Sequence, residues 1–185
     1  MRLSMKLLGL LLGAAFVAGV GFQYFLAGEE TSSESVSFSG IQTAFCPSFE
    51  CSSLPISALD SAKERILVAM YSFTNEDLRD ALIRAHERGI VVRVVVEKQQ
   101  ASGQYSQHEE LAAAGILVRI DSNPNYMHHK FAVIDSDLVI NGSMNWSGNG
   151  VGENNENVMV IHSPELNKEF ADEFENVWSE SLSFN

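Results

Sequence analysis

The residues of this chain that are best equipped for chemistry lie between His128 and Asn145. His128 and Lys130 stand two apart, Asp135 follows after four residues, and Gly142-Ser143-Met144-Asn145 follows after six more. A neutral imidazole is a competent nucleophile near neutral pH, because its unperturbed pKa is about 6.5. An ammonium, a hydroxyl and an amide can hold phosphoryl oxygens while charge develops on them. The segment therefore predicts attack on a phosphodiester without a metal ion.

The pattern of the segment also predicts how these side chains are presented. Residues 130–134 alternate with β-branched and aromatic side chains, as in a strand, and a second strand is predicted over 138–141. Side chains alternate across a strand, so His128 and Lys130 project from the same face. Asp135 falls on the opposite face. We therefore expect Asp135 to play a supporting role, through a salt bridge or a turn contact, rather than to take part in the chemical step.

The segment resembles the signature of the phospholipase D superfamily, the HKD motif, and every position of the motif is filled, with Asp135 as its aspartate. It is most similar to the single-motif branch, which includes the bacterial Nuc-type endonucleases and the mitochondrial phospholipase-D-like nucleases. The resemblance runs from about Ile41 to the C-terminus and includes residues 69–74 and Asn155-Glu156-Asn157. It implies a phospholipase D-like fold with one HKD half-site per chain.

The resemblance also implies a role for each matched residue. His128 would be the nucleophile and form a phosphohistidine intermediate, while Lys130, Ser143 and Asn145 would bind the phosphate oxygens. Glu156 would accept a hydrogen bond from the imidazole and fix its tautomer. The alternative for Glu156 is an exposed carboxylate at the start of a strand.

The chemistry needs a second imidazole, because one histidine cannot be nucleophile and proton donor in the same step. The chain holds five histidines but no second H-x-K pattern. We therefore expect a homodimer with a shared active site, in which two copies of His128 face each other. Structural or surface roles are expected for His86, His108, His129 and His162.

Composition limits the substrate and the cofactors. The sequence has no H-E-x-x-H pattern, no calcium-type loop and no C-x-x-C pair, so we expect neither a metal nor another cofactor. The formal net charge of −12 is unusual for a nucleic-acid-binding protein. Arg93, Lys98 and Arg119 either line a local basic cleft or are scattered surface charges. Three functions remain: a nuclease acting on DNA or RNA, a phospholipase D acting on membrane phospholipids such as phosphatidylcholine or cardiolipin, and a catalytically silent binding domain.

The chain is predicted to contain three segments. Residues 1–28 form a signal peptide or an uncleaved membrane anchor, because Arg2 and Lys6 precede an apolar run over 7–27. Glutamates follow the run, so we expect the remainder to be exported and lie outside the cytoplasm, either tethered or secreted. Residues 29–40 are a flexible linker rich in Ser and Glu, and residues 41–185 are the catalytic domain.

Cys46 and Cys51 are the only cysteines, and they form either a small disulfide loop or two free thiols.

The elements that position the site alternate between helix and strand. Ser163 is predicted to cap a final helix, with Pro164 in its first turn. The pattern predicts an α/β fold with a mixed, largely parallel β-sheet flanked by helices. The helices are predicted over 54–64, 76–88 and 107–114, and the remaining strands over 66–71, 90–96, 116–120 and 157–161.

Overall fold

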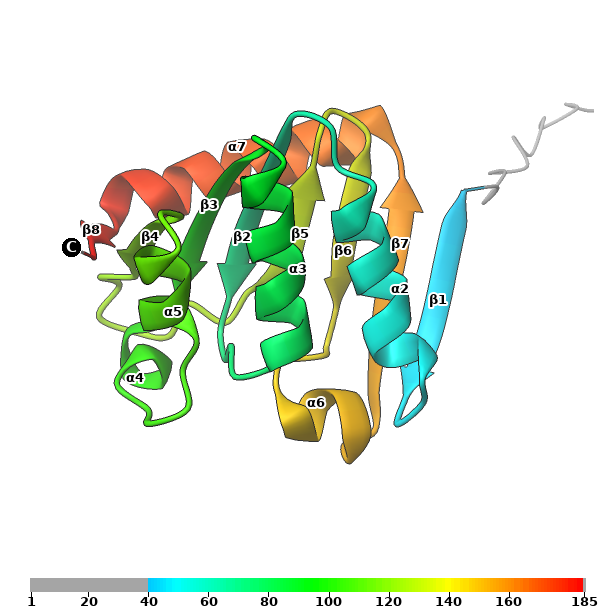
Figure 1. Cartoon of the computed structure of the whole chain (residues 1–185), viewed down its shortest axis with the longest axis horizontal. Helices are drawn as coiled ribbons and strands as arrows, with labels where there is room; N and C mark the ends of the chain where they lie inside the picture. Colours follow the sequence, from blue (N-terminus) through cyan, green and yellow to red (C-terminus); the bar gives the residue numbers. More distant parts are fainter. Residues whose placement is uncertain (1–39, 185) are drawn as a thin grey trace, which may run out of the picture. The chain divides into compact units, whose positions relative to one another are not determined.

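The computed structural model describes residues 40–184, and within them eight strands form a single sheet (Figure 1). The strands run in the order β1-β7-β6-β5-β2-β3-β4-β8. They are β1 (Ile41–Cys46), β2 (Arg65–Met70), β3 (Val91–Val96), β4 (Leu117–Ile120), β5 (Lys130–Ile134), β6 (Leu138–Gly142), β7 (Glu156–His162) and β8 (Leu182–Ser183).

The sheet is mixed, but it is not largely parallel, so that part of the prediction is wrong. Only β2, β3 and β4 are parallel to one another. The pairs β1–β7, β7–β6, β6–β5, β5–β2 and β4–β8 are antiparallel. Parallel neighbours need a long crossover that returns the chain to the same end of the sheet, and the helical connections after β2 and β3 supply one. A tight turn joins β5 to β6, which forces them to run in opposite directions.

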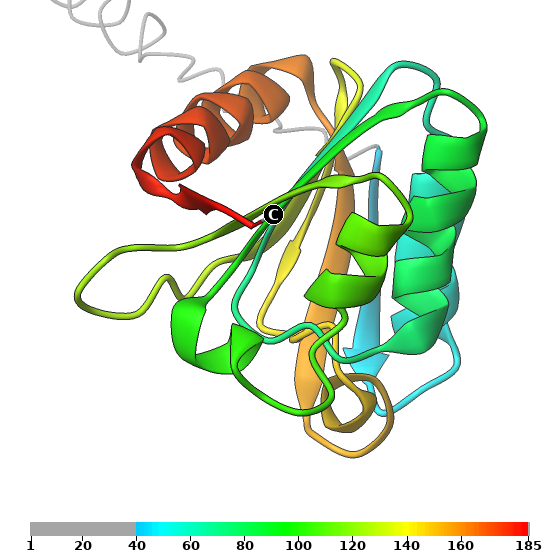
Figure 2. The same ribbon diagram turned by 60° about the vertical axis from the view of Figure 1, so that its left-hand side comes forward.

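Helices cover both faces of the sheet. Helices α2, α3 and α5 lie on one face and α7 lies on the other (Figures 1 and 2). Two short helices, α4 and α6, lie in loops. The helices span α2 (Glu50–Asp60), α3 (Glu76–Glu87), α4 (Lys98–Ala101), α5 (His108–Ala113), α6 (Gly148–Gly152) and α7 (Pro164–Glu180).

Strand β2 shows why two helical layers are needed. Its alternate residues Val68 and Met70 belong to the core beneath α2, α3 and α5, whereas Leu67 and Ala69 belong to a second core beneath α7. All four side chains are buried. A strand that is apolar on both faces must be covered on both faces, and the side chains of Phe131 and Phe174 complete the second core.

Local signals set several helix ends. The side chain of Asn75 accepts a hydrogen bond from the Leu78 amide at 2.9 Å and caps α3. Ser163 caps α7 through the Leu166 amide at 3.2 Å, with Pro164 in the first turn, as predicted. The expected N-terminal anchor over 1–28 and nearly all of the linker over 29–40 lie outside the described residues. Between residues 40 and 184, no helix has both the length and the apolar character needed to cross a bilayer.

Candidate active site

The antiparallel arrangement gathers the candidate catalytic residues at one edge of the sheet. Strands β2 and β6 end there, and β5 and β7 begin there, which is the lower edge in Figure 1. Met70 pairs with Lys130, and Gly142 pairs with Val158. We call this edge the site edge. Lys130 begins β5, Glu156 begins β7, and Ser143 and Asn145 directly follow β6, so all four come to it.

His128 and Lys130 project together, as the strand pattern predicts. The Nζ atom of Lys130 lies 3.2 Å from Nδ1 and 3.3 Å from Nε2 of His128, and it donates to the His128 carbonyl oxygen at 2.9 Å. Lys130 is half-buried, and this burial lowers the pKa of its ammonium, although nearby Glu156 acts in the opposite direction. The pair places a cation beside an exposed imidazole.

Tyr71, which follows β2, packs against the same imidazole. The ring centroids of Tyr71 and His128 are 4.4 Å apart, and Lys130 Nζ lies 5.0 Å from the Tyr71 centroid. The Tyr71 amide donates to the His129 carbonyl at 2.8 Å, and Gln100 Nε2 donates to the Tyr71 hydroxyl at 3.3 Å. These contacts orient both members of the His128–Lys130 pair. The sequence argument included Tyr71 in a matched segment but did not give it this role.

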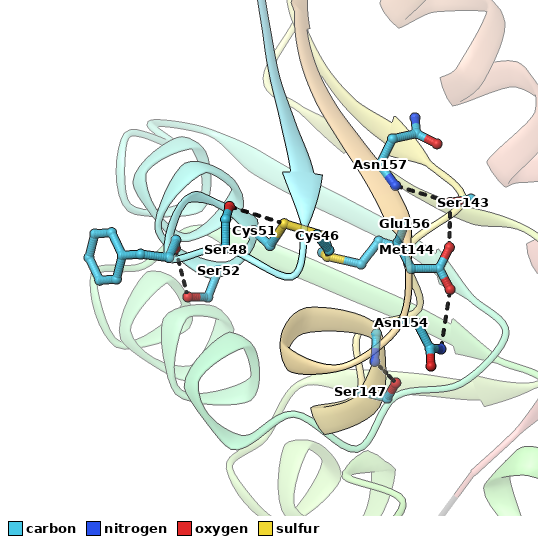
Figure 3. The surroundings of a disulfide bond; sticks show 12 residues. Cys46, Ser48, Cys51, Ser52, Ser143, Met144, Ser147, Asn154, Glu156 and Asn157 are labelled. Carbon is cyan, nitrogen blue, oxygen red and sulfur yellow. Dashed lines mark hydrogen bonds between the residues drawn. A yellow bond between two sulfur atoms is a disulfide. The ribbon is translucent and has the colours of Figure 1, made fainter.

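Ser143 and Glu156 are hydrogen-bonded to each other. Ser143 Oγ donates to Glu156 Oε2 and accepts from the Asn157 amide at 3.1 Å, while Asn154 Nδ2 donates to Glu156 Oε1 at 3.4 Å. Figure 3 shows these contacts. Within residues 40–184, no hydrogen bond joins the Glu156 carboxylate to His128. In the described residues, Glu156 therefore orients Ser143 rather than the imidazole.

Two neighbours of Ser143 show how closely this loop is built. A Cβ atom on Gly142 would lie 2.1 Å from the Asn157 carbonyl oxygen, so only glycine allows β6 and β7 to approach there. The Oδ1 atom of Asn145 is buried and has no hydrogen-bond partner among residues 40–184. This oxygen is a hydrogen-bond acceptor, so a phosphate oxygen would have to bind the Nδ2 group of Asn145 instead.

A family profile described as "Cardiolipin synthase, PLD-like domain" matches residues 56–178. The chain belongs to the phospholipase D superfamily. Its sequence contains one copy of the HKD motif of that superfamily. The fold agrees: the crystal structure of Nuc from Salmonella typhimurium, a phospholipase D family member, superposes with a TM-score of 0.76 at 32% identity, covering 78% of this chain and 97% of that one. NucT from Helicobacter pylori, at 24% identity, shares the fold with a TM-score of 0.71 over 78% of this chain and 98% of that one.

Curated relatives carry the name mitochondrial cardiolipin hydrolase. The protein from Chlamydomonas reinhardtii is 39% identical over 120 residues, which are 65% of this chain and 54% of that protein. The protein from Danio rerio is 38% identical over 77% of this chain and 60% of that protein. The human protein is 37% identical over 66% of this chain and 49% of that protein. The chain thus spans about half to three-fifths of the length of these relatives.

The aspartate of the phospholipase D motif, Asp135, lies at the end of β5 that is remote from Lys130. Its carboxylate accepts hydrogen bonds from three successive amides, at 3.0 Å from Lys63, 2.8 Å from Glu64 and 3.1 Å from Arg65. Arg65 Nε donates to the Asp135 carbonyl oxygen at 3.0 Å. These are turn contacts that join the α2–β2 loop to the β5–β6 turn, and the structure does not bring Asp135 to the site edge.

The other four histidines have contacts elsewhere. His129 projects to the opposite face, where its Nε2 lies 3.1 Å from Glu173 of α7. His108 Nδ1 lies 3.0 Å from Ser106 Oγ, and His162 Nε2 pairs with Asp137 at 2.9 Å. His86 lies near the end of α3. None of the four hydrogen-bonds to or stacks on the His128 ring, so a single copy of the chain brings one imidazole to the site edge.

Cys46 and Cys51 form a disulfide between the end of β1 and the start of α2 (Figure 3). In the β1–β7 register, Cys46 lies opposite Glu156, and its Sγ atom is 3.5 Å from Sδ of Met144. Met144 is buried and stands between Ser143 and Asn145. The disulfide therefore packs beside the loop that contains Ser143 and Asn145, the two residues for which the resemblance implies phosphate binding.

The suggested basic cleft does not form from the two arginines. Arg93 pairs with Glu175 and lies 4.9 Å from the Trp178 ring centroid. Arg119 donates to the Trp178 carbonyl oxygen at 2.5 Å. Both guanidinium groups therefore pack against α7. Lys98 remains as an exposed cation on α4. Between residues 40 and 184, no three His, Cys, Asp or Glu side chains converge in a way that would hold a metal ion.

Proposed function

We propose that this chain is a phosphodiesterase, namely a nuclease that hydrolyses DNA or RNA without a metal ion in an active site shared by two copies. The observation that carries the proposal is the exposed, polar setting of His128. A hollow of about 580 Å³ borders His128 on the α7 side of the sheet, and it is lined mainly by polar side chains that include His129 and Glu173. Small-molecule sites are mostly apolar and enclosed, whereas an open polar edge admits a long polymer.

In the first proposed step, a ring nitrogen of His128 attacks phosphorus and the bond from phosphorus to the leaving oxygen breaks. The non-bridging oxygens would be held by Lys130, Ser143 and Asn145, which the structure gathers at the site edge. The Ser143 hydroxyl donates to Glu156 in this structure. It must turn from that carboxylate to donate to a phosphate, so Glu156 is expected to set the position of Ser143 before substrate binds.

A second imidazole completes the proton balance. In its protonated form it gives a proton to the leaving alkoxide, and it later removes a proton from the water that attacks phosphorus. That attack breaks the phosphorus–nitrogen bond and restores His128. Three of the other histidines make contacts elsewhere, and the fourth, His86, lies in the last turn of α3. We therefore propose that the second imidazole is His128 of another copy, in a two-fold symmetric dimer.

The acidic surface limits how a nucleic acid can bind. The formal net charge of −12 opposes a polyanion, because neutralisation of phosphates by Lys and Arg supplies most non-specific affinity. Arg93 and Arg119 are already engaged with α7. We therefore expect weak binding that depends on short-range contacts at the site edge.

The second candidate function is hydrolysis of a membrane phospholipid. It is supported by the matched family description and by the names of the relatives, which are cardiolipin hydrolases. A membrane anchor at residues 1–28, with the catalytic domain outside the cytoplasm, would bring such a site to a lipid surface. A catalytically silent binding domain is the third candidate, although every motif residue is present.

One assay separates these functions. The full chain, purified in detergent, is given single- and double-stranded DNA, RNA, phosphatidylcholine and cardiolipin, all with a chelator present. Cleavage of nucleic acid that is lost in His128→Ala, together with a phosphoryl adduct on His128, supports the nuclease. Release of a lipid product alone supports the phospholipase, and no turnover of any substrate supports the silent domain. A requirement for added metal contradicts the mechanism.

A further inference from the structure

Tyr126 is an exposed aromatic residue on a loop that is held in place. The loop joins β4 to β5, and 57% of the Tyr126 surface is accessible, whereas its neighbour Met127 is only 4% accessible. The amide of Asn123 donates to Asp121 Oδ2 at 3.2 Å, and Ser122 Oγ donates to the carbonyl oxygen of Glu180 at the end of α7. The loop is therefore fixed while the tyrosine ring faces solvent.

The Tyr126 ring is one aromatic side chain away from the reacting imidazole. Its centroid lies 6.0 Å from that of Tyr71, with the ring planes at 88°, and Tyr71 in turn lies 4.4 Å from His128. Because the two tyrosine rings pack at nearly a right angle, the contact favours one orientation of the exposed ring beside the site edge. No proposed catalytic step uses Tyr126.

Stacking offers the kind of affinity that the acidic chain otherwise lacks. Bases of single-stranded nucleic acids stack on aromatic side chains, and removing one such side chain weakens binding roughly 5- to 150-fold per base. This attraction acts on the uncharged base, so a net charge of −12 does not oppose it. In a duplex the base faces are covered by neighbouring bases, and exposing one requires unpairing and unstacking.

We propose that Tyr126 is a base-binding subsite that holds an unpaired base of a nucleotide next to the phosphate attacked by His128. This proposal rests on the proposed nuclease function and names its substrate class: single-stranded nucleic acid, with bases present. Tyr126 is a specificity-determining residue, whereas Tyr71 orients the imidazole. Duplex substrates are cleaved more slowly because they do not offer a free base to the subsite.

The test compares Tyr126→Ala and Tyr126→Phe with Tyr105→Ala in the full chain purified in detergent. Tyr105 is the matched control, because it is 72% accessible and its ring contacts neither Tyr71 nor His128. The substrates are a single-stranded oligonucleotide, the same oligonucleotide as a duplex, and a single strand whose central nucleotides are abasic. Binding is measured separately with a 2-aminopurine oligonucleotide and the inactive variant His128→Ala, with and without Tyr126→Ala.

We expect Tyr126→Ala to raise KM for the single strand about tenfold or more, with a smaller change in kcat. The abasic strand should be cleaved equally by wild type and Tyr126→Ala, and both Tyr126→Phe and Tyr105→Ala should resemble wild type. Quenching of 2-aminopurine should be lost with Tyr126. The proposal is overturned by an equal loss on the abasic strand, by an unchanged KM, or by a change in oligomeric mass that explains the loss. If wild type cleaves none of the nucleic acids but hydrolyses cardiolipin, the nuclease proposal itself fails.

Discussion

The sulfur of Cys46 lies 3.5 Å from the sulfur of Met144, the residue between Ser143 and Asn145. Because Cys46 is disulfide-bonded to Cys51, the start of α2, the end of β1 and the candidate phosphate-binding loop meet at one point. The position of Ser143 and Asn145 therefore depends on a covalent bond that neither residue touches.

Replacing both cysteines in Cys46→Ala/Cys51→Ala should lower the free energy of unfolding by about 2 kcal/mol, from the lost closure of a short loop. It should also lower kcat several-fold at temperatures where the variant is folded, because Met144 loses its sulfur neighbour. Denaturant unfolding and kcat are measured with and without a reductant. The reductant should lower the activity of wild type and leave the variant unchanged; full activity of the reduced wild type would contradict the coupling.

Replacing Gly142 by alanine should destabilise the protein by roughly 2 to 3 kcal/mol, because the added Cβ would lie 2.1 Å from the Asn157 carbonyl oxygen and 2.9 Å from Val158 Cα. Both neighbours are backbone atoms, so β6 and β7 must separate. Gly148→Ala is the matched control, since no atom lies within 4 Å of its Cβ position. Equal Tm values for the two variants would show that β6 and β7 can separate without a loss of stability.

Asp135→Ala should lower the stability of the protein without lowering kcat. Losing the carboxylate that accepts three amides, at a residue with φ of 51°, should lower the free energy of unfolding by roughly 2 to 4 kcal/mol. The kcat of the folded fraction should stay near that of wild type, because Asp135 lies away from the site edge. Asp172→Ala, which removes one partner of an exposed ion pair, serves as the control and should be nearly neutral. A loss of kcat in folded Asp135→Ala would assign the residue a direct catalytic role.

Lys130→Met should abolish activity without lowering Tm at neutral pH. Burial lowers the pKa of Lys130 below that of the unfolded chain, so protonation of this group disfavours folding below the folded-state pKa. The penalty fades as pH rises from the folded-state pKa towards the unfolded value near 10.4. Wild-type activity should fall over the alkaline range in which Lys130 loses its proton, before an ordinary lysine does. A large drop in Tm for Lys130→Met would show that its contacts with His128 outweigh the burial.

Activity should depend on a second copy of the chain. Specific activity should fall on dilution together with the dimer fraction measured by sedimentation velocity. Mixing inactive His128→Ala subunits with wild type, under conditions of subunit exchange, should lower activity further than simple dilution does, because each mixed dimer lacks one of the two imidazoles that the shared site needs. A fully active monomer at high dilution would contradict the shared site.

The sequence was informative where one local pattern decides the outcome. The apolar runs of β2 and β3 and the cap of α7 at Ser163 follow from neighbouring residues, and so does the shared face of His128 and Lys130. The directions of the strands could not be predicted from the sequence, because pairings such as that of β1 with β7 join residues more than a hundred positions apart. The contacts of Glu156 with Ser143 and of Cys46 with Met144 could not be predicted either, because both depend on how β7 pairs with its neighbours β6 and β1.

The exposure of His128 has a consequence for the fate of the intermediate. In the proposed dimer, a phosphoryl group bonded to this ring would lie in an open site shared by two copies, where water can enter and be deprotonated by the second imidazole. We therefore expect release by hydrolysis to prevail over transfer to an added alcohol, and the adduct to be short-lived. Rapid acid-free quenching will be needed to capture it.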